Sequence, residues 1–264
     1  TKQGYELTEE LSVTGTGIEI LREAILDLSR KSKTRRDQGA FWMPVDRSFS
    51  IKGYGTVVTG SILSGAVRVG ELLELLPQQK ILKVRGLQTH GHSVQQALFG
   101  DRAAINLAAI SKDEIIRGDV LAPPHQFGPT QLLDATLHLL STASKPLKNR
   151  TRVRLHIGTR EVMARIKIIG SEMIEPGTEG TVQFFTEKPV AARRRDAFVI
   201  RRYSPPLTIG GGRILQPQTQ VRRRFRTADV EEMRALMQQN PQEMIVAKLQ
   251  QMSPLSRQEI QQQT

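Results

Sequence analysis

The sequence predicts a mainly β fold in which two β-barrels follow one another, with a helical segment on either side. Three observations lead to this fold class. Between residues 39 and 218, short aliphatic and β-branched runs recur at close intervals, separated by Gly, Pro, His and Gln, as in small closed barrels. Helical periodicity occurs only before and after this stretch. The length of 264 residues also exceeds what one hydrophobic core usually organises.

Residues 1–38 are expected to contain one helix and a linker. The apolar residues of the helix recur at helical spacing, at Ile18, Leu21, Ile25 and Leu28. The charged stretch Arg30–Arg36 has no apolar period and is typical of a linker.

Residues 39–125 predict the first barrel. The segment Ile51–Gly60 is rich in β-branched residues, and its glycines suit bulges or tight bends. Pro123 and Pro124 end the module. Further strands are expected at Leu72–Leu76, Leu82–Leu87, Ala103–Leu107 and Asp119–Leu121.

Residues 126–218 predict the second barrel. The run Arg152–Ile157 alternates, so Arg152, Arg154 and His156 should share the outward face. Gly210–Gly212 indicates a turn or a close backbone approach. Further strands are expected at Val162–Ile169, Gly180–Phe185, Ala197–Arg202 and Arg213–Leu215.

Residues 219–264 turn helical. Thr227 can cap a helix over Ala228–Gln239, and Pro241 can open a second helix over Gln242–Met252.

The charge favours a polyanionic partner. The formal net charge is +12 and the sequence pI is near 10.4, which is typical of proteins that bind nucleic acid. Residues 126–218 carry most of the excess, with 15 basic against 7 acidic side chains. A polyanion is therefore expected to meet this segment.

Composition excludes several other classes of function. The absence of cysteine excludes disulfides, thiolate nucleophiles and thiolate metal sites. No apolar run of about 18 residues and no secretory pattern occur, so we expect no membrane partner and a cytoplasmic location. His90 and His92 have no third ligand nearby, so we expect a turn there and no metal site.

The strongest motif is Phe41–Gly60, in which a proline-led strand runs into Gly-x-Gly-Thr-Val-Val-Thr-Gly. It resembles the start of domain 2 of elongation factor Tu-like GTPases. Ser12, Val13 and Thr14 resemble the last guanine-contacting loop of these GTPases, although Val13 stands where alanine is usual.

The resemblance extends in order over residues 1–218 and implies a domain plan. Residues 1–38 would be a remnant of an α/β GTPase domain plus a linker, and 39–125 and 126–218 would be the elongation factor Tu-like barrel domains 2 and 3. Residues 219–264 would be a linker and the helical start of a winged-helix domain.

In this family GTP and magnesium serve the full-length protein. The chain contains no Gly-x-x-x-x-Gly-Lys-Ser/Thr loop and no Asn-Lys-x-Asp motif. The phosphate-binding lysine and the magnesium-binding hydroxyl are thus missing. We expect a piece of a longer factor that alone binds no cofactor and hydrolyses no GTP.

Within the superfamily, Val45-Asp46-Arg47 and Gly100-Asp101-Arg102 resemble the selenocysteine-specific elongation factors. The resemblance implies that Asp46, Arg47 and Arg102 line the aminoacyl pocket. A selenol is largely ionised near neutrality, so guanidinium groups would favour the selenolate over neutral seryl and cysteinyl side chains. The alternative is that these residues form surface ion pairs beside turns.

The same resemblance implies selenocysteyl-tRNA and the ribosome as partners. Messenger-RNA hairpin binding would need later winged-helix domains that this chain does not include. The second barrel would contact the tRNA, with Arg193, Arg194, Arg195, Arg201 and Arg202 as candidates. The run Arg222–Arg224 could be a further contact or a solvated face.

Two other functions fit parts of the sequence. One is a general aminoacyl-tRNA or initiator-tRNA carrier of the same superfamily, against which Arg47 and Arg102 argue. The other is a non-GTPase RNA-binding barrel protein, against which the ordered resemblance from Ser12 to Pro217 argues.

Overall fold

The computed structural model describes residue 15, residues 17–31 and residues 39–238. The chain divides after residue 37 into two compact units. In the first unit, helix α1 covers Ile18–Lys31 and confirms the predicted helix. Arg30 and Lys31 were expected in the linker but form its last turn, where cations interact favourably with the unpaired carbonyls. Ser12, Val13 and Thr14 lie outside the described residues.

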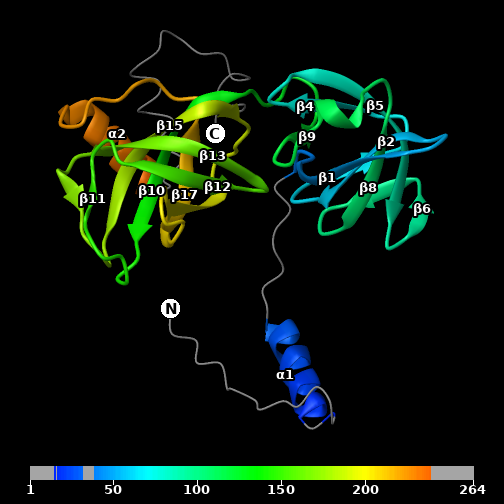
Figure 1. Cartoon of the computed structure of the whole chain (residues 1–264), viewed down its shortest axis with the longest axis horizontal. Helices are drawn as coiled ribbons and strands as arrows, with labels where there is room; N and C mark the ends of the chain where they lie inside the picture. The colour runs from blue at the N-terminus through cyan, green and yellow to red at the C-terminus, as the bar shows by residue number, and fades with distance from the viewer. Residues whose placement is uncertain (1–14, 16, 32–38, 239–264) are drawn as a thin grey trace. The chain divides into compact units, whose positions relative to one another are not determined.

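The second unit begins with an antiparallel barrel (Figure 1). Its sheet has the order β4-β9-β1-β2-β8-β5-β6, and β5 also pairs with β4, which closes the barrel and leaves β6 as an extension. The elements are β1 (Met43–Ile51), β2 (Gly55–Ser61), β3 (Ala66–Arg68), β4 (Leu72–Leu76), β5 (Lys80–Thr89), β6 (His92–Val94), β7 (Gln96–Leu98), β8 (Arg102–Leu107), the 3-10 turn η1 (Lys112–Glu114) and β9 (Val120–Ala122).

The predicted strands of this barrel are confirmed, most of them with shifted ends. The segment Ile51–Gly60 contains the tight bend that its glycines suggested, because β1 ends at Ile51 and β2 starts at Gly55. Gly53 and Gly55 both have positive φ, which a side chain would disfavour. His90 lies in the turn between β5 and β6.

The second barrel is closed in the order β10-β15-β13-β12-β16-β17 (Figure 1). The short strands β11 and β14 pair with each other outside it. The elements are β10 (Thr130–Leu139), β11 (Leu147–Lys148), β12 (Arg152–Ile157), β13 (Arg160–Ile169), β14 (Met173–Ile174), β15 (Glu179–Val190), β16 (Ala197–Arg202) and β17 (Thr208–Pro217).

One expectation for this barrel needs correction. Gly210–Gly212 do not form a turn but lie inside β17, which is longer than predicted. The close backbone approach is confirmed, because a Cβ on Gly212 would lie 1.8 Å from the carbonyl oxygen of Thr136. Gly210 and Gly212 let β17 approach β10 where the barrel closes, whereas Gly211 lies against Phe198 of β16.

Helix α2 (Thr227–Gln238) confirms the first C-terminal helix. Met233 and Leu236 are buried against Ile169 and Leu215 of the second barrel. The helix therefore packs on this barrel, while the expected helix over residues 242–252 lies outside the described residues. The winged-helix assignment stays a prediction.

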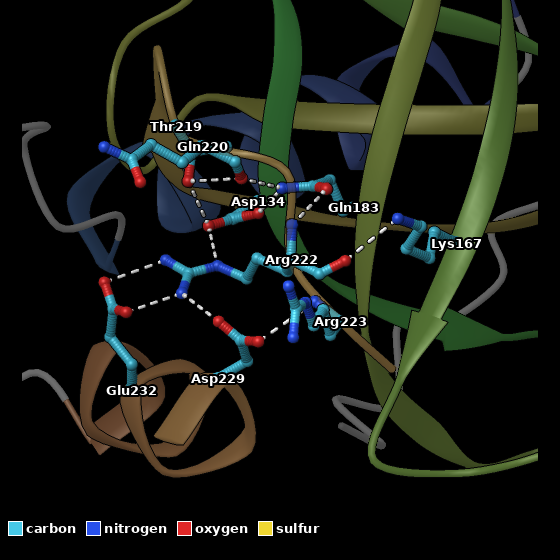
Figure 2. A network of polar contacts seen from close by, with 9 residues as sticks. All are labelled: Asp134, Lys167, Gln183, Thr219, Gln220, Arg222, Arg223, Asp229 and Glu232. Atoms are coloured by element: carbon cyan, nitrogen blue, oxygen red, sulfur yellow. Dashed lines mark hydrogen bonds and ion pairs between the residues drawn. The ribbon is translucent and has the colours of Figure 1, made fainter. Parts of the chain in front are cut away.

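Arg222 lies at the centre of a buried polar network that joins the barrel to α2 (Figure 2). Its Nε donates to Asp134 at 2.5 Å, and its terminal nitrogens donate to Glu232 at 2.6 and 2.9 Å. Burial alone would lower the pKa of Arg222, but the two carboxylates raise it. Arg224 also bonds internally, to the carbonyl of Ser171. Arg222 is buried, so it belongs neither to an RNA-contact surface nor to a solvated face, and both interpretations are corrected for this residue. Arg223 is exposed, and Arg224 is half-buried.

No helix in the described part of the chain is long and apolar enough to cross a membrane.

Candidate functional site

The candidate site starts from a β-bulge in β1. Val45 pairs with Gly60 and Arg47 pairs with Thr59, so Asp46 is an extra residue in β1. Adjacent strand residues normally point to opposite faces, and a bulge removes that alternation locally. Val45 points into the core, so Asp46 and Arg47 both lie on the outer face of the barrel.

Gly60 makes room for this bulge. A Cβ on Gly60 would lie 2.3 Å from the carbonyl oxygen of Pro44, closer than any side chain allows. The last glycine of the Gly-x-Gly-Thr-Val-Val-Thr-Gly motif therefore has a structural role one position from Thr59. The motif builds the site as well as the strand.

Side chains from two other strands, β2 and β8, meet the carboxylate of Asp46 on β1. Thr59 of β2 donates its hydroxyl hydrogen to Oδ1 at 2.6 Å. Arg102 of β8 places a terminal nitrogen 2.7 Å from Oδ2. The Asp46 side chain is 21% exposed and that of Arg102 is 57% exposed, so the guanidinium remains open to a ligand.

The electrostatics keep Asp46 ionised. Partial burial alone would raise the pKa of Asp46, but the hydrogen bonds from Thr59 and Arg102 and the charges of Arg102 and Arg47 lower it. The site is thus one carboxylate in contact with the guanidinium group of Arg102, with the charge of Arg47 nearby. Its net positive charge suits a small anion, because guanidinium groups bind anions through directed hydrogen bonds.

The structure brings together Asp46, Arg47 and Arg102, the three residues that the resemblance grouped. Sequence reasoning missed Thr59, which supplies the shortest contact to the carboxylate. The role of Thr59 becomes apparent only from the strand register, in which Thr59 pairs with Arg47 beside the bulge.

Arg152, Arg154 and Arg201 form a basic face on the outside of strands β12 and β16 of the second barrel. Arg152 and Arg154 of β12 point outward, as predicted, and both guanidinium groups stack on the ring of Tyr203, at 4.9 and 5.7 Å. Arg154 also faces Arg201 of β16 in the strand register. Burial and the charges of Arg201 and Arg154 lower the pKa of His156, despite nearby Glu161.

The other tRNA-contact candidates occupy different environments. Arg193 stacks on Trp42 of the first barrel at 4.7 Å and donates to Ser64, so it joins the barrels. Arg194 and Arg195 line a cavity of about 230 Å³ that is also lined by Arg213, Glu179 and Leu236. Arg202 donates to Ser144 at 2.7 Å. Among the described residues, no group of three or more His, Asp or Glu could hold a metal ion.

Two family profiles match the chain. Residues 55–122 match elongation factor Tu domain 2, and residues 134–221 match the β-barrel domain of selenocysteine-specific elongation factors. With the tandem barrels, these matches define the class: the chain carries the paired barrels of a translation elongation factor.

Curated relatives narrow the class. The selenocysteine-specific elongation factor of Desulfomicrobium baculatum is 38% identical over 247 residues, which cover 94% of this chain and 39% of the relative. That of Escherichia coli is 30% identical over 205 residues, or 76% of this chain and 31% of the relative. The chain belongs to the selenocysteine-specific elongation factor family and spans about two fifths or less of these relatives. The family prediction is confirmed.

Solved structures agree with this assignment. A bacterial selenocysteine-specific elongation factor superposes with a TM-score of 0.74 at 25% identity, covering 89% of this chain and 38% of that one. Translation elongation factor SelB from Methanococcus maripaludis, in its apo form, gives 0.71 at 28% identity, covering 79% and 48%. The predicted mainly β fold with two consecutive barrels is confirmed.

Proposed function

We propose that the two barrels hold the aminoacylated end of selenocysteyl-tRNA while the factor delivers it to the ribosome at recoded UGA codons. Residues 39–125 would provide the aminoacyl pocket and residues 126–218 the tRNA contact. GTP and magnesium would act through the GTPase domain of the full-length factor in the cytoplasm. Membership of the selenocysteine-specific family supports this assignment.

The observation that carries the proposal is the Asp46–Arg102 contact at 2.7 Å with Arg47 beside it on the same outer face. A selenolate could bind to the exposed side of Arg102 and to Arg47, and Asp46 would orient the guanidinium group and limit repulsion between the two cations. Neutral seryl and thiol groups would gain less, since hydrogen bonds to a charged acceptor are about twice as strong as neutral ones.

The basic face would bind tRNA phosphates. Arg152 and Arg154 are held against Tyr203 on the outside of β12, where Arg152 also pairs with Glu187 and Arg154 with Glu161, so phosphates would share these guanidinium groups with the two carboxylates. Phosphate contacts of this kind give affinity and register but no selection among aminoacyl groups. Selection would therefore rest on the pocket of the first barrel.

The test compares affinities of the full-length, GTP-bound factor for one tRNA body charged with selenocysteine, cysteine or serine. The proposal predicts the tightest binding for selenocysteine and similar, weaker binding for the other two near neutral pH. Equal affinity for all three would instead support a general aminoacyl-tRNA carrier. Equal affinity for aminoacylated and free tRNA would support a non-selective RNA-binding protein.

A further inference from the structure

The second barrel contacts the first at the residue just before the Asp46 bulge. Thr159 lies in the turn between β12 and β13, and its hydroxyl donates to the carbonyl oxygen of Val45 at 2.6 Å. The backbone N–H of Gly118 donates to the same oxygen at 3.0 Å. Both lone pairs of this carbonyl are thus engaged, one of them by the other barrel.

An ion pair lies beside this hydrogen bond. Arg160 is 3.5 Å from Asp119, and their side chains are 10% and 0% exposed. The carbonyl of Asp119 accepts the N–H of Val45 at 2.8 Å, so the loop that meets Arg160 also holds Val45 from its other side. Gly118 has a φ of +97°, and a Cβ there would lie 2.5 Å from Arg160 Cδ. The turn of the second barrel therefore fits closely against this loop.

The position of the contact matters because a bulge is a weak point of a strand. The extra residue of a bulge is left unpaired in the ladder, so its orientation depends on the residues on either side. Here Val45 is the residue before Asp46, and its backbone is fixed by Thr159, Gly118 and Asp119. Two of these partners belong to the first barrel, and Thr159 belongs to the second.

We propose that Thr159 is a positioning residue for the pocket: through the Val45 carbonyl, it holds the bulge in the register that places Asp46 against Arg102. Thr159 acts through the backbone and does not touch the aminoacyl group. The inference rests on the proposed function of the pocket. Thr159 would also connect the aminoacyl pocket with the surface that contacts tRNA phosphates, because the β12–β13 hairpin that carries Thr159 presents Arg152 and Arg154 on the basic face.

The first test measures the pocket without any ligand. The pKa of the Asp46 carboxyl is followed by carbon NMR in wild type, Thr159→Val and Thr159→Ser. Thr159→Val keeps the shape and removes the donor, so the Asp46 contacts should loosen and the pKa should rise toward the ordinary aspartate value. Thr159→Ser restores the hydroxyl and should restore the wild-type pKa. Thr151→Val is the control, because the hydroxyl of Thr151 donates locally, to the carbonyl of Lys148, just before β12 and away from the Val45 carbonyl.

The second test measures selection in the full-length factor. Thr159→Val should reduce the affinity ratio of selenocysteyl-tRNA to seryl-tRNA by about fivefold, which corresponds to about 1 kcal/mol. The affinity for seryl-tRNA should change little, and Thr159→Ser should recover the ratio. If Thr159 had only a structural role, Thr159→Val would reduce the affinity for both tRNAs by the same factor.

The two readouts separate the failure of this inference from that of the proposed function. If Thr159→Val folds and the pKa of Asp46 is unchanged, the positioning role is wrong, regardless of the measured tRNA affinities. A wild-type factor that does not discriminate would overturn the proposed function, while the pKa would still decide on Thr159. If Thr159→Val does not fold, Thr159→Ala is measured in the same way.

Discussion

Asp46 is held by a threonine hydroxyl and an arginine, and each contact should be visible in its titration. Thr59→Val removes the hydroxyl that donates to Asp46 at 2.6 Å and keeps the side-chain shape. Since this hydrogen bond lowers the pKa of Asp46, the pKa should rise in the variant. Carbon NMR of the aspartate carboxyls measures the change.

Thr178→Val is the matched control, because its hydroxyl bonds only to the carbonyl of Glu175 in a turn of the second barrel. Because the pKa of Asp46 is lowered in the folded protein, the pH dependence of its contribution to stability has a definite sign. Asp46 contributes stability above its unfolded pKa and loses it as the pH falls through the folded pKa. An Asp46 pKa that is the same in wild type and Thr59→Val would contradict the described hydrogen bond.

The sequence analysis grouped Asp46 with Arg47, although the alternation of side chains in a regular strand does not predict this grouping. Asp46 and Arg47 are adjacent in a strand, and a regular strand would place them on opposite faces. Only the bulge brings both to one face, and no residue pattern indicated it. Grouping these residues with Arg102 came from resemblance to a family. Thr59 was missed because a β-branched residue in a strand is typical of packing.

Between elements, the ion pair of Arg160 and Asp119 should stabilise the contact of the two barrels. Arg160→Met keeps much of the apolar length and leaves a buried carboxylate without its cation. Losing one partner of a buried pair costs about 3–5 kcal/mol, so the free energy of unfolding should fall by about that amount at neutral pH. Urea denaturation measures it.

The pH dependence of this loss has a definite sign. Burial raises the pKa of Asp119, and removing the cation raises it further. The deficit of Arg160→Met should therefore shrink as the pH falls and Asp119 becomes protonated in both proteins. A second change, Asp119→Asn, should recover part of the loss at neutral pH. A deficit that does not vary with pH would mean that Arg160 acts by packing alone.

Helix α2 should depend on Arg222 in the same way. Arg222→Gln leaves Asp134, which is fully buried, without its cation and removes two hydrogen bonds to Glu232 of α2. We expect a loss of about 3–5 kcal/mol in the free energy of unfolding. Amide hydrogen exchange should also become faster in α2 than in the barrel strands.

Arg223→Gln is the control, because Arg223 is the exposed neighbour of Arg222. Unchanged exchange in α2 of Arg222→Gln would show that Met233 and Leu236 alone hold the helix.

Three strands were predicted with their observed ends, namely Leu72–Leu76, Arg152–Ile157 and Ala197–Arg202. The first and last are mainly apolar runs, and only Arg152–Ile157 alternates apolar and polar residues. Strand β10 was not predicted, because Asp134 takes an apolar position in it and is buried there with hydrogen bonds from Arg222, Gln183 and Thr219. Such long-range pairing leaves no local pattern in the sequence. Gly210–Gly212 predicted a close approach of two backbone segments, but the sequence did not indicate which strand lies opposite them.

For the whole molecule, the charge of the second barrel should determine how tRNA binding responds to salt. Neutralising Arg194 and Arg195 together should weaken all tRNAs alike and reduce the slope of log affinity against log salt by about one per lost phosphate contact. The control pair is Arg68→Gln with Lys83→Gln on the first barrel. Unchanged affinity and slope would show that these arginines do not contact tRNA.

We propose that charge in the first barrel selects the cargo, and the Arg102→Gln variant tests this claim. Glutamine keeps hydrogen-bonding capacity and removes the charge that lies 2.7 Å from Asp46. In the full-length, GTP-bound factor, binding of selenocysteyl-tRNA should weaken by about 1–3 kcal/mol, or about five- to 150-fold, while seryl-tRNA binding changes little. An equal loss for both tRNAs would contradict the claim, because Arg102 would then support the tRNA end or the barrel and not the selenolate.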